Sequence, residues 1–239
     1  VMAYLFLKAQ GLAGKPVADI RIDGAGKKVT RSDNCRVSDL SVSSDNLTFT
    51  YEAKSLPYPI DTSYYDNEKH TQADALSVIP FMDEMNYEGL SVSGLSDGYY
   101  GLTIGREFIG RFTARELERG INMALLQNTP QYKQAMKIRQ MNEERWLKER
   151  KMREFYWVEY NLMRKTGMLW ACNEAAVDTL RKYRPHDIFL QWNGDLWLQY
   201  MHKGIREDCV NEQQDLVNQI YEQNKPIPLR IEIKKFTDL

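Results

Sequence analysis

The chain has 239 residues, of which 43% are hydrophobic and 27% are charged, which is the composition of a folded globular protein and not of a disordered one. Because 32 basic residues stand against 33 acidic ones, the formal net charge is −1, which argues against whole-chain attraction to nucleic acid or anionic lipid. No apolar run reaches the roughly 20 residues of a membrane-spanning helix. We therefore expect no nucleic-acid partner and no membrane span.

The first residues have the pattern of a buried helix. The apolar run 1–7 is followed by its only charge, Lys8, whereas a secretory signal places positive charge before the apolar residues. Gly11 is typical of a helix C-cap. Residues 1–14 are therefore interpreted as the last helix of an upstream domain, and the chain as a fragment or a processed product.

Residues 15–112 carry the period-2 alternation of β-strands. The alternating runs, separated by turn residues, are 17–23, 36–42, 47–51, 90–92 and 99–104. Several short strands at this spacing predict an antiparallel β-sandwich-like region or a curled sheet of about 90–100 residues. Between them, residues 56–74 are expected to form a long polar loop.

Residues 113–239 change to a helical period. Thr113 and Glu116 form a capping box, and Thr129 before a proline predicts the start of a long helix over about 129–166, since nothing interrupts it until Gly167. Its middle is dense in charge, which predicts a helix that is half-buried at its ends and solvated in the middle.

Shorter segments follow the long helix. The expected elements are helices over 173–183, 186–200 with a break near Asn193-Gly194, and 208–223, and a last strand over about 228–235. The predicted fold class is therefore α+β: an antiparallel β-sandwich-like region followed by a long helix and a helical tail.

Residues 94–98 match G-x-S-x-G, the pattern of a hydrolase nucleophile elbow around Ser96. Such an elbow needs a helix after the serine, because the helix N-terminus helps to hold the oxyanion. The run 99–104 that follows has a strand pattern, so the motif is interpreted as a hairpin turn. His70, His186 and His202 lie far apart in the sequence, and no spacing favours a triad with any of them.

Metal and cofactor sites find little support. Residues 61–74 contain side chains of the types that bind hard metal ions, namely Asp61, Asp66, Glu68, His70 and Asp74. Their spacing fits neither an EF-hand nor a zinc motif. Calcium is the one metal worth testing there. Residues 24–28 lack the Ser/Thr of a phosphate-binding loop and are interpreted as a turn. Three cysteines, Cys35, Cys172 and Cys209, are too few and too scattered for a disulfide framework or a structural zinc site, and their redox state stays open. We expect no metal and no cofactor.

Two groups of side chains, the aromatic residues and a basic run, have both a binding and a non-binding interpretation. Exposed rings could form a platform for a carbohydrate or an acyl chain, and the candidates for a carbohydrate platform in the β-region are Tyr64, Tyr65, Tyr99 and Tyr100. Core packing is the alternative for aromatic residues. The basic residues of 145–153 alternate with glutamates, which indicates a solvated helix face and not an RNA-binding patch.

The order of segments resembles the C-terminal part of bacterial SGNH/GDSL-type hydrolases, the lipase/acylhydrolase-like esterases. The resembling stretches are 1–8, 94–110, 112–117, 120–124, 128–132, 142–145 and 157–160. In that family a flavodoxin-like α/β domain carries the serine in a Gly-Asp-Ser block and the histidine in an Asp-x-x-His block. This chain has neither block.

The resemblance implies that the nucleophile, the oxyanion-hole residues and the catalytic His–Asp pair belong to a missing N-terminal half. No catalytic residue and no substrate-binding residue can then be assigned here. The chain is expected to be the accessory half of a serine ester hydrolase, inactive alone, with the N-terminal catalytic domain as partner and a small ester or acylated carbohydrate as substrate. For such a bacterial protein the expected location is periplasmic or extracellular. Alternatives are a carbohydrate-binding module and a structural module that forms homo-oligomers through the long helix.

Overall fold

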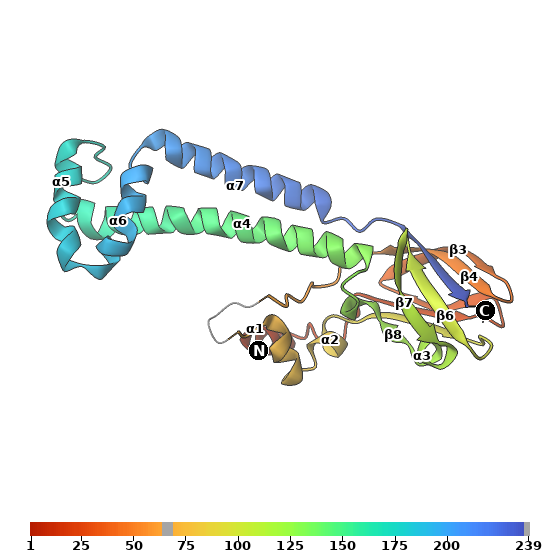
Figure 1. The fold of residues 1–239 in the computed structure, drawn as a ribbon. Helices are drawn as coiled ribbons and strands as arrows, with labels where there is room; N and C mark the ends of the chain where they lie inside the picture. The colour runs from red at the N-terminus through yellow and green to blue at the C-terminus, as the bar shows by residue number, and fades with distance from the viewer. Residues whose placement is uncertain (64–68, 237–239) are drawn as a thin grey trace. The chain divides into compact units, whose positions relative to one another are not determined.

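A computed structural model describes residues 1–63 and 69–236 of the chain (Figure 1). The chain divides into two units, Val1–Lys137 with Asn224–Leu239, and Ile138–Gln223. The division falls inside the long helix and not at Thr113, where the sequence changes period. The reason is that helix α3 (Ala114–Arg119) packs on the strands of the first unit.

The first unit contains a four-stranded sheet with the order β2-β1-β5-β8. Its strands are β1 (Ala18–Asp23), β2 (Lys28–Asp33), β5 (Glu88–Ser93) and β8 (Ile121–Asn122). Strands β1 and β5 run parallel, so the prediction of a purely antiparallel region is wrong for this pair. Parallel strands need a long crossover, and here the chain passes through two strands of the other sheet before it returns.

The second sheet of this unit has five strands in the order β3-β4-β9-β6-β7, and its described pairs are antiparallel. Its strands are β3 (Cys35–Val42), β4 (Asn46–Ala53), β6 (Tyr99–Ile104), β7 (Glu107–Thr113) and β9 (Leu229–Lys235). The alternating segment near the end of the chain thus becomes a central strand, with Ile231 opposite Phe49 on β4 and Ile104 on β6.

The two sheets share one hydrophobic core. Inward-facing residues of both sheets are almost fully buried, among them Ile20, Ile22, Leu90, Phe49, Leu102, Ile231 and Ile233. Each such side chain contributes about 1.5–3 kcal/mol when it is taken out of water. The alternation of buried and exposed residues along the strands follows from this one-sided burial.

Short helices complete the first unit. They are α1 (Met2–Ala9), the 3-10 helix η1 (Gln72–Ser77), α2 (Phe81–Glu84), α3 and the 3-10 turn η2 (Met123–Leu125). The predicted capping box of α3 is present, because the Glu116 amide donates to Thr113 Oγ1 and the Thr113 amide donates to the Glu116 carboxylate. The polar loop expected over 56–74 ends in helix η1. Thr71 and Asp74 form a capping box at the start of η1, as Thr113 and Glu116 do at the start of α3.

The connection 94–98 corrects one prediction. It joins β5 in one sheet to β6 in the other, so it is a link between sheets and not a hairpin. The hairpin lies one step later, between β6 and β7, where Gly105 has a φ of 62°. Gly94 has a φ of 73° at a point where a Cβ would lie 2.9 Å from the Ala25 backbone nitrogen, so the link requires glycine there.

The second unit is helical. Its elements are α4 (Pro130–Val158, which begins in the first unit), the π-helical turn η3 (Glu159–Met163), α5 (Glu174–Tyr183), the 3-10 turn η4 (Arg184–His186), α6 (Ile188–Tyr200) and α7 (Lys203–Gln223). Helix α7 runs beside α4 (Figure 1), and Lys148 Nζ on α4 lies 2.7 Å from Glu212 Oε2 on α7. The middle of α4 therefore contacts α7, whereas the sequence analysis predicted a solvated segment there.

Two helical predictions also need correction. The break expected near Gly194 is absent, because the missing side chain makes room for Arg184, whose guanidinium binds Asp195. The long helix does not continue as an α-helix to residue 166, since it widens into a π-turn at Glu159. Among the described residues, no helix combines the length and the apolar character that crossing a membrane requires.

Candidate functional site

Ser96 does not occupy a nucleophile elbow. Its hydroxyl accepts a hydrogen bond from Lys235 Nζ at 2.8 Å and lies 3.1 Å from the Tyr100 hydroxyl. A strand follows the serine, so no helix N-terminus faces it. The contacts join the end of β9 to the link between the sheets, which is a structural role, and residues 94–98 show no Ser–His pair.

The histidines lie on separate segments. His70 precedes the capping residue of η1 in the first unit, whereas His186 ends η4 in the second. His202 is exposed, and its Nδ1 lies 3.3 Å from the Sγ of exposed Cys172. A thiol and an imidazole at this distance can exchange a proton, but no carboxylate orients the ring in the described contacts.

The acidic residues of the loop 61–74 are held by the loop itself where the structure describes them. Asp61 Oδ1 accepts from the Ser63 amide and hydroxyl, and Asp74 caps η1. Asp66 and Glu68 lie outside the described residues, so calcium binding stays a prediction. In the part of the chain that is described, no three His, Cys, Asp or Glu side chains gather as a metal site would require.

The interpretation of residues 24–28 as a turn is confirmed. They join β1 to β2, and the Gly26 amide donates to Asp23 Oδ1 at 2.8 Å. An aspartate that closes its own turn in this way is typical of a β-turn and leaves no phosphate cradle.

A buried carboxylate in the first unit escaped the sequence analysis. Glu88 on β5 is fully buried, and it accepts hydrogen bonds from the Tyr51 hydroxyl at 2.8 Å and from Gln131 Nε2 at 3.2 Å. Burial raises the pKa of Glu88 to about 7 and also raises the pKa of Tyr51. A single glutamate at the start of a strand gives no sequence signal of this network, because its partners come from β4 and α4.

A second buried carboxylate holds the π-turn of the second unit. Glu159 accepts from the Trp197 indole Nε1–H and from the Trp170 amide, each at 2.8 Å. These bonds fix Trp170 in the left-handed region with a φ of 61°, where its ring meets the rings of Tyr156 and Tyr160 edge to face. The π-turn is therefore explained by the buried carboxylate and needs no ligand.

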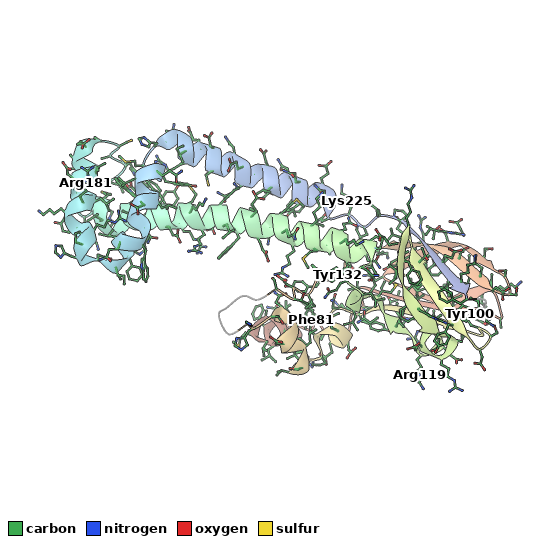
Figure 2. The ribbon with its side chains drawn as sticks, viewed as in Figure 1. Phe81, Tyr100, Arg119, Tyr132, Arg181 and Lys225 are labelled. Atoms are coloured by element: carbon green, nitrogen blue, oxygen red, sulfur yellow. The ribbon has the colours of Figure 1, made fainter. Side chains whose placement is uncertain are left out.

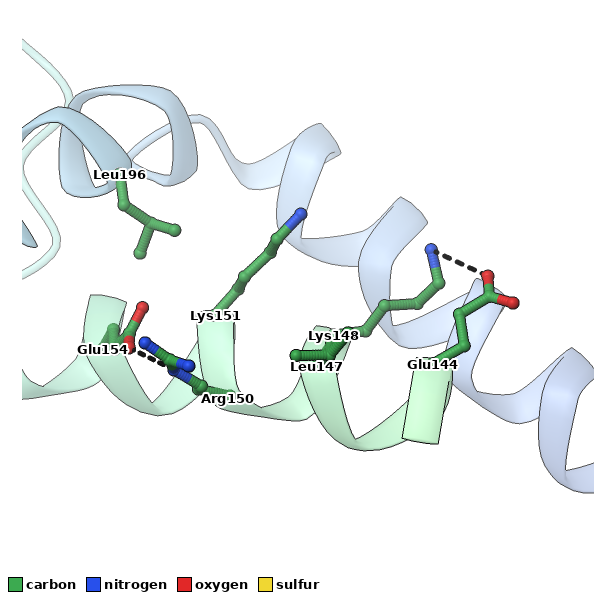
Figure 3. A pocket seen from close by; sticks show the side chains of 7 residues that line it. All are labelled: Glu144, Leu147, Lys148, Arg150, Lys151, Glu154 and Leu196. Carbon is green, nitrogen blue, oxygen red and sulfur yellow. Dashed lines mark hydrogen bonds and ion pairs between the residues drawn. The ribbon is translucent and has the colours of Figure 1, made fainter. Parts of the chain in front are cut away.

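A charged groove lies between α4 and α6 in the second unit (Figure 3). Its volume is about 370 Å³, and its walls are Leu147 and Leu196. Most of its charges are paired: Lys148 contacts Glu144 and Glu212, and Arg150 contacts Glu154. The sequence analysis interpreted the basic run as a solvated helix face; the structure shows that several of its charges are ion-paired, one of them with α7, and the groove holds no set of convergent catalytic groups.

The candidate for a functional surface is the apolar face of α1. Tyr4 anchors this helix, since its hydroxyl donates to Glu84 Oε2 at 2.7 Å on α2, and Lys8 Nζ donates to Glu84 Oε1 at 2.9 Å. The ion pair lowers the pKa of Glu84 and raises the pKa of Lys8. On its other side α1 exposes Met2 and Phe6, which are 81% and 64% accessible. Because these exposed apolar side chains are neighbours on one helix, the α1 face is a candidate contact surface.

Beside this face lies an apolar cavity of about 250 Å³. Residues from α1, η1, α2 and the segment between β4 and η1 line it, namely Val1, Ala3, Tyr4, Leu7, Tyr58, Ile60, Gln72, Ala75, Leu76, Ile79 and Phe81. Tyr58 and Phe81 meet there edge to face with ring centroids 5.7 Å apart. Figure 2 labels Phe81 and Tyr132, and the Tyr132 hydroxyl donates to the Ile60 carbonyl to hold this segment.

The proposed carbohydrate platform needs a correction in its membership. Tyr99 and Tyr100 point to opposite sides of β6, so Tyr100 is 1% accessible in the core and Tyr99 is 50% accessible. Tyr100 (labelled in Figure 2) is therefore excluded from any platform. Tyr64 and Tyr65 lie outside the described residues.

Comparisons with known proteins connect this fold to a diltiazem-metabolizing enzyme. Residues 136–225 match the family described as the diltiazem deacetylase C-terminal helical domain. The solved structure of a gut microbial diltiazem-metabolizing enzyme matches 98% of this chain with a TM-score of 0.91 and 38% sequence identity. No curated protein matches the chain.

The structural match has a defined extent. The chain spans about half of that enzyme, since the alignment covers 53% of it. The α+β fold with two sheets and a helical unit is thus shared with half of a diltiazem-metabolizing enzyme, and the helical unit with a domain named for deacetylation.

Proposed function

We propose that this chain is the C-terminal part of a serine ester hydrolase of the SGNH type that removes acyl groups such as acetyl. The observation that carries the proposal is the 38% identity over 98% of the chain with half of a diltiazem-metabolizing enzyme. The family name of residues 136–225, a diltiazem deacetylase domain, supports the acyl-ester substrate class.

In this proposal the chain supports the reaction and does not carry it out. The nucleophilic serine of a preceding catalytic domain attacks the ester carbonyl, the alcohol leaves, and water hydrolyses the acyl-enzyme. The motif around Ser96 supplies no Ser–His pair among the described residues, because its hydroxyl contacts Lys235 and the Tyr100 hydroxyl and no imidazole.

The surface through which the chain supports catalysis is the exposed face of α1. Met2, Leu5 and Phe6 are each more than half accessible, and burial against a catalytic domain would contribute at most about 1.5–3 kcal/mol for each side chain. The adjacent apolar cavity would then lie near the junction and help to shape access to the active site.

A pair of variants in the full-length protein tests this proposal. Phe6→Asp places a charge on the α1 face, whereas Val210→Asp makes the same change at an exposed valine of α7 that is 51% accessible. The proposal predicts loss of diltiazem deacetylation and of p-nitrophenyl acetate hydrolysis in the first variant only. Deletion of residues 113–239 is also expected to abolish both activities. Unchanged kinetics in Phe6→Asp and in the deletion variant would refute an accessory role near the active site.

A further inference from the structure

The outer face of the five-stranded sheet carries aromatic rings where β9, β6 and β7 lie side by side. Inward residues of β6 such as Tyr100 fill the core, so Tyr99 and Gly101 face outward. Phe108 on β7 lies opposite Thr103, and the Phe236 amide donates to the Tyr99 carbonyl. Tyr99, Phe108 and Phe236 are 50%, 58% and 41% accessible, so three rings from separate segments lie exposed on this face.

Gly101 forms the floor between two of these rings. A Cβ on Gly101 would lie 3.1 Å from the Phe108 ring and 3.2 Å from the Phe236 ring. Both rings therefore converge over bare backbone, and any larger residue at this position would push them apart. Tyr99 and Phe108 lie on paired strands, and Phe236, the residue after β9, is tied to β6 by the hydrogen bond from its amide to the Tyr99 carbonyl.

Arg111 adds positive charge to the aromatic face. Its guanidinium lies 4.2 Å from the centroid of the Tyr99 ring and 4.9 Å from that of Phe236, so it is stacked and held in place. Lys234 lies on the same face, because both Arg111 and Lys234 pair with Gly101 from the two neighbouring strands. Within the described residues, neither cation forms an ion pair.

A cavity continues from this face. Its volume is about 280 Å³, and it is lined by Asp97, Gly98, Tyr99, Thr113, Ala114 and Arg115. Tyr99 belongs both to the cavity and to the aromatic face, so the two are continuous. Arg115 brings a further cation that has no ion-pair partner in the described part of the chain, against the single carboxylate of Asp97.

We propose that this aromatic face, made of Tyr99, Gly101, Phe108, Arg111 and Phe236, is a binding site for an acidic saccharide. Arg111 covers one face of the Tyr99 and Phe236 rings, whereas no described cation covers the Phe108 ring, which can stack on the apolar C–H face of a pyranose unit. The unpaired cations Arg111 and Lys234 supply partners for the carboxylate of a uronic acid.

The inference stands apart from the proposed ester hydrolysis, since binding to this face requires no catalytic domain. It also replaces the platform expected from the sequence: Tyr99 remains a member, whereas Phe108, Arg111 and Phe236 enter only through the pairing of β6 with β7 and the course of the chain after β9.

Affinity electrophoresis and calorimetry with polygalacturonate test the site on the chain as it stands. Binding is expected, and it should weaken as salt is added because the cations contribute. Phe108→Ala and Arg111→Gln should each bind about tenfold more weakly. Tyr221→Ala removes a more exposed ring, 69% accessible on α7, and should bind like the unaltered chain. Unchanged unfolding temperatures will show that the variants are folded.

Three results would overturn the inference. They are no binding to polygalacturonate at millimolar saccharide, equal losses in Tyr221→Ala and Phe108→Ala, and tighter binding to a single-stranded RNA oligonucleotide than to polygalacturonate. Equal affinity for neutral mannan and insensitivity to Arg111→Gln would also contradict it, since the acidic class depends on Arg111.

Discussion

Glu88 makes the stability of the first unit depend on pH in an unusual direction. Its pKa is raised from the ordinary value of 4.5 to about 7 by burial, so the folded state holds the proton more tightly than the unfolded state does. The stability that this group contributes is fully present below pH 4.5 and is lost as pH rises to about 7. The difference between the two pKa values corresponds to about 3 kcal/mol, as an upper figure.

The surroundings of Glu88 explain why its neutral form is stable in the folded protein. The Tyr51 hydroxyl donates to it at 2.8 Å, and these donor bonds only partly offset the cost of burying the charge. The side-chain oxygen of Gln131 is buried without a hydrogen-bond partner, and a rotated amide could offer it to a protonated carboxyl group. Glu88→Gln has nearly the same shape, keeps an acceptor for Tyr51 and carries no charge at any pH.

Urea denaturation of the unaltered chain and of Glu88→Gln at pH 5 and pH 8 measures this effect. We expect the unaltered chain to lose up to about 3 kcal/mol more between pH 5 and pH 8 than the variant does, because only the unaltered chain ionises at this site. Other titrating groups are common to both proteins and cancel in the difference. If the two proteins show the same change between pH 5 and pH 8, the argument that Glu88 titrates near 7 is refuted.

Three further predictions concern other sites. Glu159→Ala should destabilise the second unit by about 2–4 kcal/mol, because it leaves the Trp197 indole N–H buried without its acceptor; an unchanged unfolding curve followed by tryptophan fluorescence would contradict this. Thr113→Ala removes the N-cap of α3 and should cost about 1 kcal/mol in thermal unfolding, whereas Thr113→Ser should cost far less. Among the thiols, Cys172 should react with a disulfide reagent in the native chain, and the two buried cysteines only after unfolding; fast labelling of all three would show that the core opens readily.

Local patterns in the sequence were sufficient to locate several elements. Strands such as β1 and β9 alternate because one face is buried, and the Thr113 capping box identifies the start of α3 from two residues. Such signals depend only on neighbours in the chain. They identify an element without identifying its partner.

Pairing between distant segments could not be predicted in the same way. The parallel pairing of β1 with β5 and the insertion of β9 between β4 and β6 depend on long crossovers that leave no local pattern. For the same reason Glu88 reads as an ordinary strand residue, although Tyr51 and Gln131 enclose it.

The aromatic face shows the same limit at a candidate site. Tyr99 and Tyr100 are indistinguishable as adjacent tyrosines until the facing of β6 separates them into an exposed ring and a core ring. Phe108 and Phe236 both approach Gly101, and this proximity follows from the pairing of β6 with β7 and from the course of the chain after β9. A sequence pattern can nominate aromatic residues, but the sheet decides which of them share a face.

Homo-oligomerisation through the long helix stays a prediction. Helix α7 already covers part of α4, as the contact between Lys148 and Glu212 indicates, so a second copy would have to use the remaining surface. Sedimentation of the chain at high concentration decides this, because a strict monomer would remove the structural module as an alternative.

Hydrolysis of p-nitrophenyl acetate by three proteins tests the central claim most directly. They are the chain as it stands, its Ser96→Ala variant, and the full-length product of the gene. The account predicts activity in the full-length protein alone, since no serine in residues 94–98 has an imidazole partner. Activity in the chain that disappears with Ser96→Ala would contradict it and would make Ser96 a nucleophile.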